Sequence, residues 1–433
     1  MISPREDITG IIGGAGPWQR KVFLLVLVAT LPNAWHILVL TFLAPNIDHW
    51  CGGRPGVFHN ISAEEWKNFS VPLVADETGQ QSYSKCWMFD VMNDTNLNNT
   101  DKAQNRSLHS CLVWEYDHSQ YTSSVVEQWD LVCDNSWLIS LSQSLYMSGY
   151  LVSSFVTGQL SDRFGRRPII LLSLSVGSLS GILCVLSPSF IIFVILRFFV
   201  ALGVTGIVTS SFVLLSEIDN GFQGKFYTSK KKHRYSHGLL GKIIRIFYHF
   251  IRFVISFIFF GLSFNTNNLG GDPFLNFLIA GAVEFPSYLG TIFVVKRLGR
   301  KFPLLISVIT AGVALLLIIP IPYELVWLQV TVAMIGKLAI TAAFAIVYVY
   351  SAELFPTVVR NVGVGTSSTC ARIGSMLAPF VKELGTAVDP ALSQGLFGAL
   401  CLLAGCLILT LPETHNKPIV DTLEEEKEEN ANS

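Results

Sequence analysis

Long apolar stretches separated by short polar segments occupy most of the chain after its first 21 residues. A stretch of roughly 20 apolar residues is long enough for a helix to cross the hydrocarbon core of a bilayer, which is about 30 Å thick. The pattern predicts ten such helices, over residues 22–44, 137–160, 168–188, 189–215, 244–264, 274–295, 303–321, 323–350, 361–381 and 391–411. The expected fold class is therefore all-α, a polytopic membrane protein.

Composition supports a lipid bilayer as the solvent of this chain. The sequence is 51% hydrophobic and only 14% charged, and its mean hydropathy is +0.48. No phosphate-binding loop, zinc signature or nucleophile motif is present, so the residues support neither an ATPase nor a hydrolase. We expect no enzyme activity, no cofactor, no bound metal and no nucleic-acid partner, and we leave the oligomeric state open.

Lys and Arg gather in alternate connections between the predicted spans. By the positive-inside rule, these connections face the cytosol. The clusters are Arg20 with Lys21, Arg163–Arg167, Lys225–Arg245, Lys296–Lys301, and Arg360. Ten crossings then place both ends in the cytosol, with an N-terminal segment 1–21, a linker 218–243 and an acidic tail 412–433. Segment 1–21 has no cleavable signal pattern, so we expect the first span to be an uncleaved insertion signal.

The connection 45–136 is long, polar and predicted to lie outside the cell. It contains four cysteines and five Asn-x-Ser/Thr triplets, which indicate a glycosylated, disulfide-bonded loop on the secretory route to the plasma membrane. The cysteines are Cys51, Cys86, Cys111 and Cys133, and the triplets begin at Asn60, Asn68, Asn93, Asn98 and Asn105. Two disulfides are expected, and their three connectivities stay open.

A short cationic motif occurs twice. Gly158-Gln-Leu-Ser-Asp-Arg-Phe-Gly-Arg-Arg167 lies between two spans, and Lys296-Arg-Leu-Gly-Arg-Lys301 follows about 130 residues later. Each copy precedes a glutamate that closes a later span, Glu217 or Glu353, at intervals of 51 and 53 residues. This spacing indicates an internal repeat, which is typical of transporters.

We expect the motif to be a latch between helices that forms in one conformation and breaks in the other. Gly158 would let helices approach closely, and the charged side chains would pair or bind helix ends. The residues assigned to this latch are Gly158, Asp162, Arg163, Gly165, Arg166, Arg167, Glu353 and Arg360. The alternative is a simple positive-inside anchor, especially for the second copy, which lacks the first glycine and the aspartate.

With these motifs the chain resembles the major facilitator superfamily and, within it, the solute carriers for organic cations, organic anions and carnitine. The resemblance extends over nearly the whole chain. It rests on the cysteine-rich outer loop, the first cationic motif, and three further stretches: 261–272, 348–361 and Leu411-Pro-Glu-Thr414. The stretch from Glu353 to Arg360 is shared with sugar porters and does not discriminate.

The chain departs from this family in its first half. Two spans follow Glu353, whereas the chain runs from Glu217 through a polar segment directly into the first span of the second half. The family implies twelve spans, so the first repeat (137–217 after the first span) would lack two helices that the second (244–411) retains. Asp219 to Lys225 resembles the junction of an excision. Losing an even number of spans preserves the downstream topology but exposes a cavity wall.

Two charges within predicted spans mark the expected substrate site. Glu284 and Arg372 would each cost about 2.5–3.5 kcal/mol at the centre of a helix in lipid, so each should face a cavity or a partner. Pairing with each other or with backbone is the alternative. The resemblance implies Arg at position 372 in anion and carnitine carriers, where it would bind a carboxylate. Glu284, with Tyr348 or Tyr350, would meet an ammonium group, although both tyrosines fit core packing equally well. Pro32 and Asn33 are predicted to break the first helix and to line the same cavity, with a mere kink as the alternative.

The sequence thus predicts transmembrane transport of small organic ions, such as carnitine-like zwitterions, cations or anions, by alternating access. A coupled inorganic ion is an open question. A different class of function is a non-transporting form that binds a full-length partner, and the missing helix pair is the feature that separates the two. Sugar transport is a third alternative, weakened because a neutral sugar offers no counter-charge to Glu284 and Arg372.

Overall fold

The structure, a computed structural model, describes residues 17–52, 62–75, 81–90, 107–219, 239–265, 271–322, 324–355 and 360–414. It divides into two units. The outer loop forms one unit, Leu40–Ile139, and the remaining segments, Met1–Val39 and Ser140–Ser433, form the other. The loop between the first two predicted spans is therefore a folded unit of its own.

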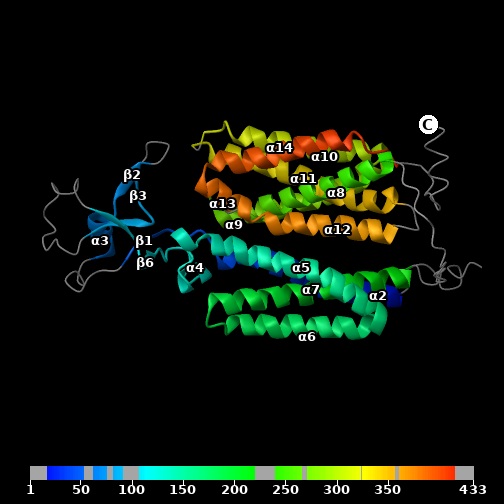
Figure 1. Ribbon diagram of the computed structural model, residues 1–433, viewed down its shortest axis with the longest axis horizontal. Helices are drawn as coiled ribbons and strands as arrows, with labels where there is room; N and C mark the ends of the chain where they lie inside the picture. Colours follow the sequence, from blue (N-terminus) through cyan, green and yellow to red (C-terminus); the bar gives the residue numbers. More distant parts are fainter. Residues whose placement is uncertain are drawn as a thin grey trace, which may run out of the picture. The chain divides into compact units, whose positions relative to one another are not determined.

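Each of the ten predicted spans is a helix (Figure 1). The helices are α2 (Pro17–Leu43), α5 (Trp137–Phe164), α6 (Arg166–Val185), α7 (Phe190–Asp219), α8 (Leu239–Phe264), α9 (Pro273–Leu298), α10 (Lys301–Ile318), α11 (Val326–Leu354), α12 (Arg360–Leu377) and α14 (Pro390–Ile408). Within the described residues, seven helices are long and apolar enough to cross a membrane by length and composition alone. Helices α2, α5 and α12 are not among them, and within α2 only the shorter segment Asn33–Leu43 is apolar by this measure. Helices α5 and α12 are rich in serine and other small polar residues, which α5 largely buries.

Capping residues and glycines fix where several helices begin. Asp272 accepts hydrogen bonds from the backbone N–H groups of Phe274 and Leu275, and Pro273 follows it at the first helical position of α9. The turns before α6 and α10 each contain a glycine in the left-handed region, Gly165 at φ +91° and Gly299 at φ +85°. The two copies of the cationic motif therefore share a backbone conformation, which supports the internal repeat.

The helices after the linker pack around one hydrophobic core. Helix α8 contacts α11, α12 and α14, while α10 contacts α11 and α14, and α9 contacts α11. Before the linker, α6 and α7 pack tightly: a Cβ on Gly203 would lie 2.5 Å from the backbone nitrogen of Gly177. Small residues allow this approach, as is common in membrane helices.

The outer unit is built from short strands that the sequence pattern did not predict. Three antiparallel pairs form: β1 (His49–Cys51) with β6 (Trp114–Tyr116), β2 (Leu73–Ala75) with β3 (Gln81–Tyr83), and β4 (Trp87–Phe89) with β5 (Leu108–Ser110). Two short helices, α3 (Ala63–Ser70) and α4 (Val125–Gln128), complete the unit. Ser62 and Glu65 form a capping box at the start of α3.

Both expected disulfides are present, and the structure gives their connectivity. Cys51 pairs with Cys111, with Cα atoms 5.5 Å apart, and Cys86 pairs with Cys133, with Cα atoms 5.6 Å apart. These separations are normal for disulfides. Of the five glycosylation triplets, the structure describes only that of Asn68, which is exposed on α3. Asn60, Asn93, Asn98 and Asn105 lie outside the described residues.

Three local predictions are wrong. Gly158 does not permit a close helix contact, because a Cβ built there meets no other described segment within 4 Å. Helix α2 runs through Pro32 and Asn33 without a break. The connection between the predicted spans 361–381 and 391–411 is largely the short helix α13 (Phe380–Ala387), which follows α12 after Ala378 and Pro379.

Candidate functional site

Arg372 projects from α12 toward α5, where it meets backbone, which is the alternative that the sequence analysis gave for this charge. Its Nη1 donates a hydrogen bond to the carbonyl oxygen of Tyr150 at 3.1 Å, and the guanidinium lies 5.8 Å from the Tyr150 ring centre. Nearby, the Ser144 hydroxyl donates to the Met376 carbonyl oxygen at 2.7 Å. Arg372 therefore belongs to the contact between the first and second halves of the bundle, which alternating access has to break and reform.

A second arginine, which the sequence analysis missed, lies on α8. Arg252 is only 2% exposed, and its guanidinium carbon lies 3.9 Å from the ring centre of Tyr348 on α11. The signal was available, because Arg252 is a charge within the predicted span 244–264. Without coordinates, nothing in the sequence told which face of that helix it occupied.

Arg252 and Arg372 have no acidic partner among the described residues. Arg372 lies within electrostatic range of Arg252 and of the Tyr348 hydroxyl. The Nε–H group of each guanidinium is buried and donates no hydrogen bond to another described residue. Two cations without counter-charge are costly in a membrane interior unless a ligand or water meets them.

Glu284 does have a partner within the protein, which is neither Arg372 nor the backbone. Its Oε1 lies 3.0 Å from Nζ of Lys337 on α11. Lys337 also donates to the Ser263 hydroxyl, and its ammonium lies 4.1 Å from the ring centre of Phe259. The sequence analysis missed Lys337. Because this pair neutralises Glu284, the buried charge left over among the described residues of this half is positive.

The two tyrosines assigned to the site lie in different surroundings. Tyr348 is 49% exposed and packs edge-on against Phe344, so its ring is accessible beside Arg252. Tyr350 is fully buried in the core, and its hydroxyl donates to the Pro412 carbonyl oxygen. Two residues along a helix turn a side chain by about 200°, so one helix cannot present both to the same site.

A further buried arginine lies in the first half. Arg197 on α7 is 4% exposed, stands 4.8 Å from the ring centre of Tyr146 and donates to the Gln143 side-chain oxygen at 3.4 Å. On α5 the neighbouring Tyr150 donates from its hydroxyl to Asn33 of α2. These contacts join α2, α5 and α7 through polar groups, and sequence reasoning identified only Asn33 among them.

In the first cationic motif, Arg166 pairs with Asp162 one turn away. The N–O distance is 2.6 Å, and Arg166 also donates to the Ser161 hydroxyl at 3.0 Å. The carboxylate of Asp162 is 73% exposed, and Arg163 and Arg167 are exposed as well. This pair lies at the surface, where ion pairs contribute little.

The second copy of the motif makes the more extensive set of contacts. Arg300 donates from Nε and Nη2 to Glu353 at 3.1 and 2.8 Å, and Thr414 donates to the other carboxylate oxygen at 2.7 Å. Glu413 accepts hydrogen bonds from the backbone N–H groups of Arg300 and Lys301 at the start of α10. The sequence analysis assigned Glu353 to the latch but missed Arg300 and Glu413. Arg360 begins α12, and its side chain lies outside the description.

Comparison with known proteins gives the family of the chain. Residues 133–219 match the family model of the Major Facilitator Superfamily, and residues 224–425 match that of Sugar (and other) transporter. The chain is 31% identical to the organic cation transporter protein of Drosophila melanogaster, covering 97% of this chain and 94% of that protein. The chain belongs to the organic cation and carnitine transporter family of the major facilitator superfamily. This transporter is also 29% identical to organic cation/carnitine transporter 2 of Homo sapiens and of Mus musculus, covering 97% of this chain and 93% of each of theirs.

The same comparison bears on the prediction that two helices are missing. The alignment with the Drosophila transporter has 528 positions. This chain fills about 420 of them, which is 97% of its 433 residues. About 108 positions of that relative therefore have no counterpart here. A pair of spans of roughly 20 residues each, with a cytosolic segment, fits in this length. The two family matches meet between residues 219 and 224, where the sequence analysis places the excision.

Proposed function

We propose that this transporter recognises small organic ions through a carboxylate and favours anions and carnitine-like zwitterions over simple cations. The observation that carries the proposal is the charge of the site: Arg252 and Arg372 have no acidic partner in the described chain, whereas Glu284 is paired with Lys337. A neutral sugar would leave both arginines without a counter-charge. Relatives of this chain are named organic cation and organic cation/carnitine transporters. A carnitine-like zwitterion is the substrate type that fits both those names and the positive charge of this site.

In this proposal each arginine has a distinct role. Arg372 binds the carboxylate, since a guanidinium can form two parallel hydrogen bonds with it. Arg252 adds a second positive charge and holds the Tyr348 ring by a cation–π contact. The exposed Tyr348 then offers a face to the rest of the substrate, an aryl group or a quaternary ammonium.

Transport follows the mechanism of the family, in which two helical halves rock about a central site. Arg372 lies at the contact between the halves, so a carboxylate that replaces the Tyr150 carbonyl as its partner changes the energy of that contact. We place the protein in the plasma membrane with both ends in the cytosol, on the basis of its charge distribution. The substrate gradient, the membrane potential or a coupled inorganic ion would drive transport.

Ligand-dependent thermal stabilisation of the purified chain tests the recognition step. An aryl carboxylate and carnitine should raise Tm, Arg372→Ala should abolish the shift, and Arg252→Gln should weaken it. Arg245→Gln, on α8 but two turns before Arg252, is the matched control and should keep the shift. Equal stabilisation of the parent chain and the Arg372→Ala variant would contradict the proposal.

A non-transporting form is the second candidate function, and the alignment supports it. About 108 positions of the Drosophila relative are absent here, and Gly158 faces no other described segment. A first half without two helices would bind substrate through the second half yet fail to seal the cavity. Such a chain would act by binding a full-length partner, which co-purification with a differently tagged twelve-span relative would detect.

A further inference from the structure

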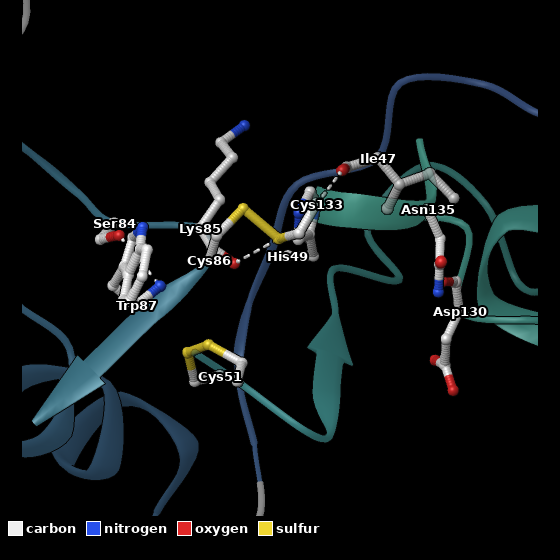
Figure 2. The surroundings of a disulfide bond; sticks show 11 residues. Ile47, His49, Cys51, Ser84, Lys85, Cys86, Trp87, Asp130, Cys133 and Asn135 are labelled. Carbon is white, nitrogen blue, oxygen red and sulfur yellow. Dashed lines mark hydrogen bonds between the residues drawn. A yellow bond between two sulfur atoms is a disulfide. The ribbon is translucent and has the colours of Figure 1, made fainter. Parts of the chain in front are cut away.

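Three side chains able to bind a metal ion lie together in the outer unit (Figure 2). One ring nitrogen of His49 and the sulfur atoms of Cys86 and Cys133 lie within 4.8 Å of one another. In this structure the two sulfurs form a disulfide. A disulfide is a poor metal ligand, whereas the two thiolates that its reduction yields are strong ligands for soft metals.

The hydrogen bonding of His49 prepares its ring for such a role. Nδ1 lies 3.1 Å from the Ile47 carbonyl oxygen, so in the neutral ring Nδ1 carries the proton and Nε2 the lone pair. Nε2 is buried and has no hydrogen-bond partner in the described chain. Metal-binding histidines commonly donate their other N–H to a backbone carbonyl, which fixes the tautomer and the ring orientation. Strand β1, paired with β6, holds His49 in place.

The other disulfide of the unit lacks these features. Cys51 and Cys111 are 0% and 5% exposed, and no histidine joins them in a group of metal-binding side chains among the described residues. Cys86 and Cys133 are partly exposed. A small-molecule reductant therefore reaches Cys86–Cys133 more readily, and only this pair has an imidazole beside it.

We propose that the Cys86–Cys133 pair is a two-state site, a disulfide when oxidised and a zinc site with His49 when reduced. The thiolate of a small-molecule thiol attacks one sulfur, which forms a mixed disulfide and releases the other cysteine as a thiolate. A second thiol molecule then displaces the first as its disulfide and leaves two cysteine thiols. Zn²⁺ binds both sulfurs and Nε2 of His49, and the two thiol protons are released.

The geometry suits Zn²⁺. Tetrahedral zinc with Zn–S bonds of about 2.3 Å requires the sulfurs to lie roughly 3.8 Å apart, a separation that side-chain rotation provides once the bond is broken. Three protein ligands leave a fourth position for water, and two sulfur ligands exclude Mg²⁺ and Ca²⁺. Lys85, next to Cys86, is paired with Asp48 at 3.0 Å, so its charge near the metal is balanced.

Alkylation of the purified full-length chain tests the site. The protein is reduced with a phosphine, incubated with or without Zn²⁺ and treated with a thiol-alkylating reagent, and mass spectrometry then follows each cysteine. Zn²⁺ should slow the alkylation of Cys86 and Cys133 together and leave Cys51 and Cys111 unchanged. The site would be refuted if Zn²⁺ protected all four cysteines equally or protected none of them.

Variants separate the proposed ligand from other histidines. Removing a residue that hydrogen-bonds to a metal ligand lowers metal affinity on the order of 10–100-fold. Removing the ligand itself in His49→Ala should therefore weaken the Zn²⁺ protection of Cys86 and Cys133 by at least as much. The matched control is His109→Ala, which changes an exposed histidine of the same unit. In this variant Zn²⁺ should protect Cys86 and Cys133 as it does in the parent. As a measurement on the unchanged chain, Co²⁺ should give thiolate-to-metal absorption bands after reduction only. Bands before reduction, or full protection in His49→Ala, would overturn the proposal.

Discussion

At the scale of single residues, buried charge determines what the bundle is able to bind. Glu284 and Lys337 neutralise each other, but unequally: the Lys337 side chain is 5% exposed and that of Glu284 31%. Breaking a buried pair strands whichever charge remains. The consequence therefore depends on which partner is removed.

Glu284→Gln should destabilise the protein more than Lys337→Met does. The first change leaves an ammonium in the interior, which costs about 3–5 kcal/mol, whereas the second leaves a carboxylate that water reaches. The double variant should recover most of the loss. Thermal unfolding of the three variants in detergent measures this order, and a Lys337→Met protein less stable than Glu284→Gln would contradict it.

Arg372 should be more sensitive to geometry than to charge alone. In a version with the missing spans restored, Arg372→Ala should lose uptake of carnitine and of organic anions. Arg372→Lys keeps the charge but cannot form two parallel hydrogen bonds, so a partial defect is expected. Uptake by Arg372→Ala equal to that of its parent would make this residue purely structural.

Sequence alone found some of these residues and not others, for a physical reason. Glu284 and Arg372 stand out because each lies in the middle of an apolar segment. Arg252 and Lys337 also lie within predicted spans, but their importance depends on which residue each contacts. That Lys337 reaches Glu284 and Arg252 reaches Tyr348 follows from helix packing, which hydropathy does not encode.

At the scale of elements, the two copies of the cationic motif are unequal. Asp162–Arg166 is an exposed pair within one turn, whereas Glu353 joins α11 to Arg300 before α10 and to Thr414 after α14. We expected the first copy to be the latch and the second to be nearer an anchor. The contacts of the second copy are the more extensive, and the latch itself stays a prediction.

Glu353→Gln should therefore lower Tm clearly, and Asp162→Asn should hardly change it. The glutamate carboxylate accepts charge-assisted hydrogen bonds that are half buried, each worth about 1.5–3 kcal/mol. An exposed pair contributes roughly 0–1 kcal/mol. Thermal unfolding curves of the two variants test this order. Equal losses of Tm would show that exposure does not determine how much each ion pair contributes to stability.

The predictability of the elements follows their length. Ten helices were predicted because an apolar run of that length has few other structures in a bilayer. The three-residue strands of the outer unit are too short for an alternating pattern to reveal them. Disulfide connectivity depends on which strands meet, and the division of 361–381 into α12 and α13 depends on local packing near Pro379, so neither was predictable.

At the scale of the whole molecule, the predicted topology leads us to expect that the outer unit is glycosylated. Protein made in mammalian or insect cells should shift in electrophoretic mobility after glycosidase treatment. Replacing Asn60, Asn68, Asn93, Asn98 and Asn105 by Gln should remove the shift. Correctly trafficked protein without any shift would contradict the extracellular placement of this loop.

If the first half lacks two helices, as the repeat spacing predicts, transport should be impaired. Uptake of labelled carnitine, tetraethylammonium and an aryl anion, divided by the amount of protein at the surface, should fall well below that of a twelve-span relative. Normalisation is necessary because lost packing also lowers surface expression. Uptake per molecule near that of the relative would show that ten spans suffice.

The most direct test of the account is the charge preference of the unchanged chain, because binding does not require a complete transport cycle. Purified protein is loaded with a labelled aryl carboxylate and challenged with unlabelled aryl carboxylate, carnitine or tetraethylammonium at equal concentration. Two arginines without acidic partners among the described residues predict displacement by the aryl carboxylate first, by carnitine second and hardly at all by tetraethylammonium. Displacement by tetraethylammonium as effective as that by the carboxylates would contradict the account.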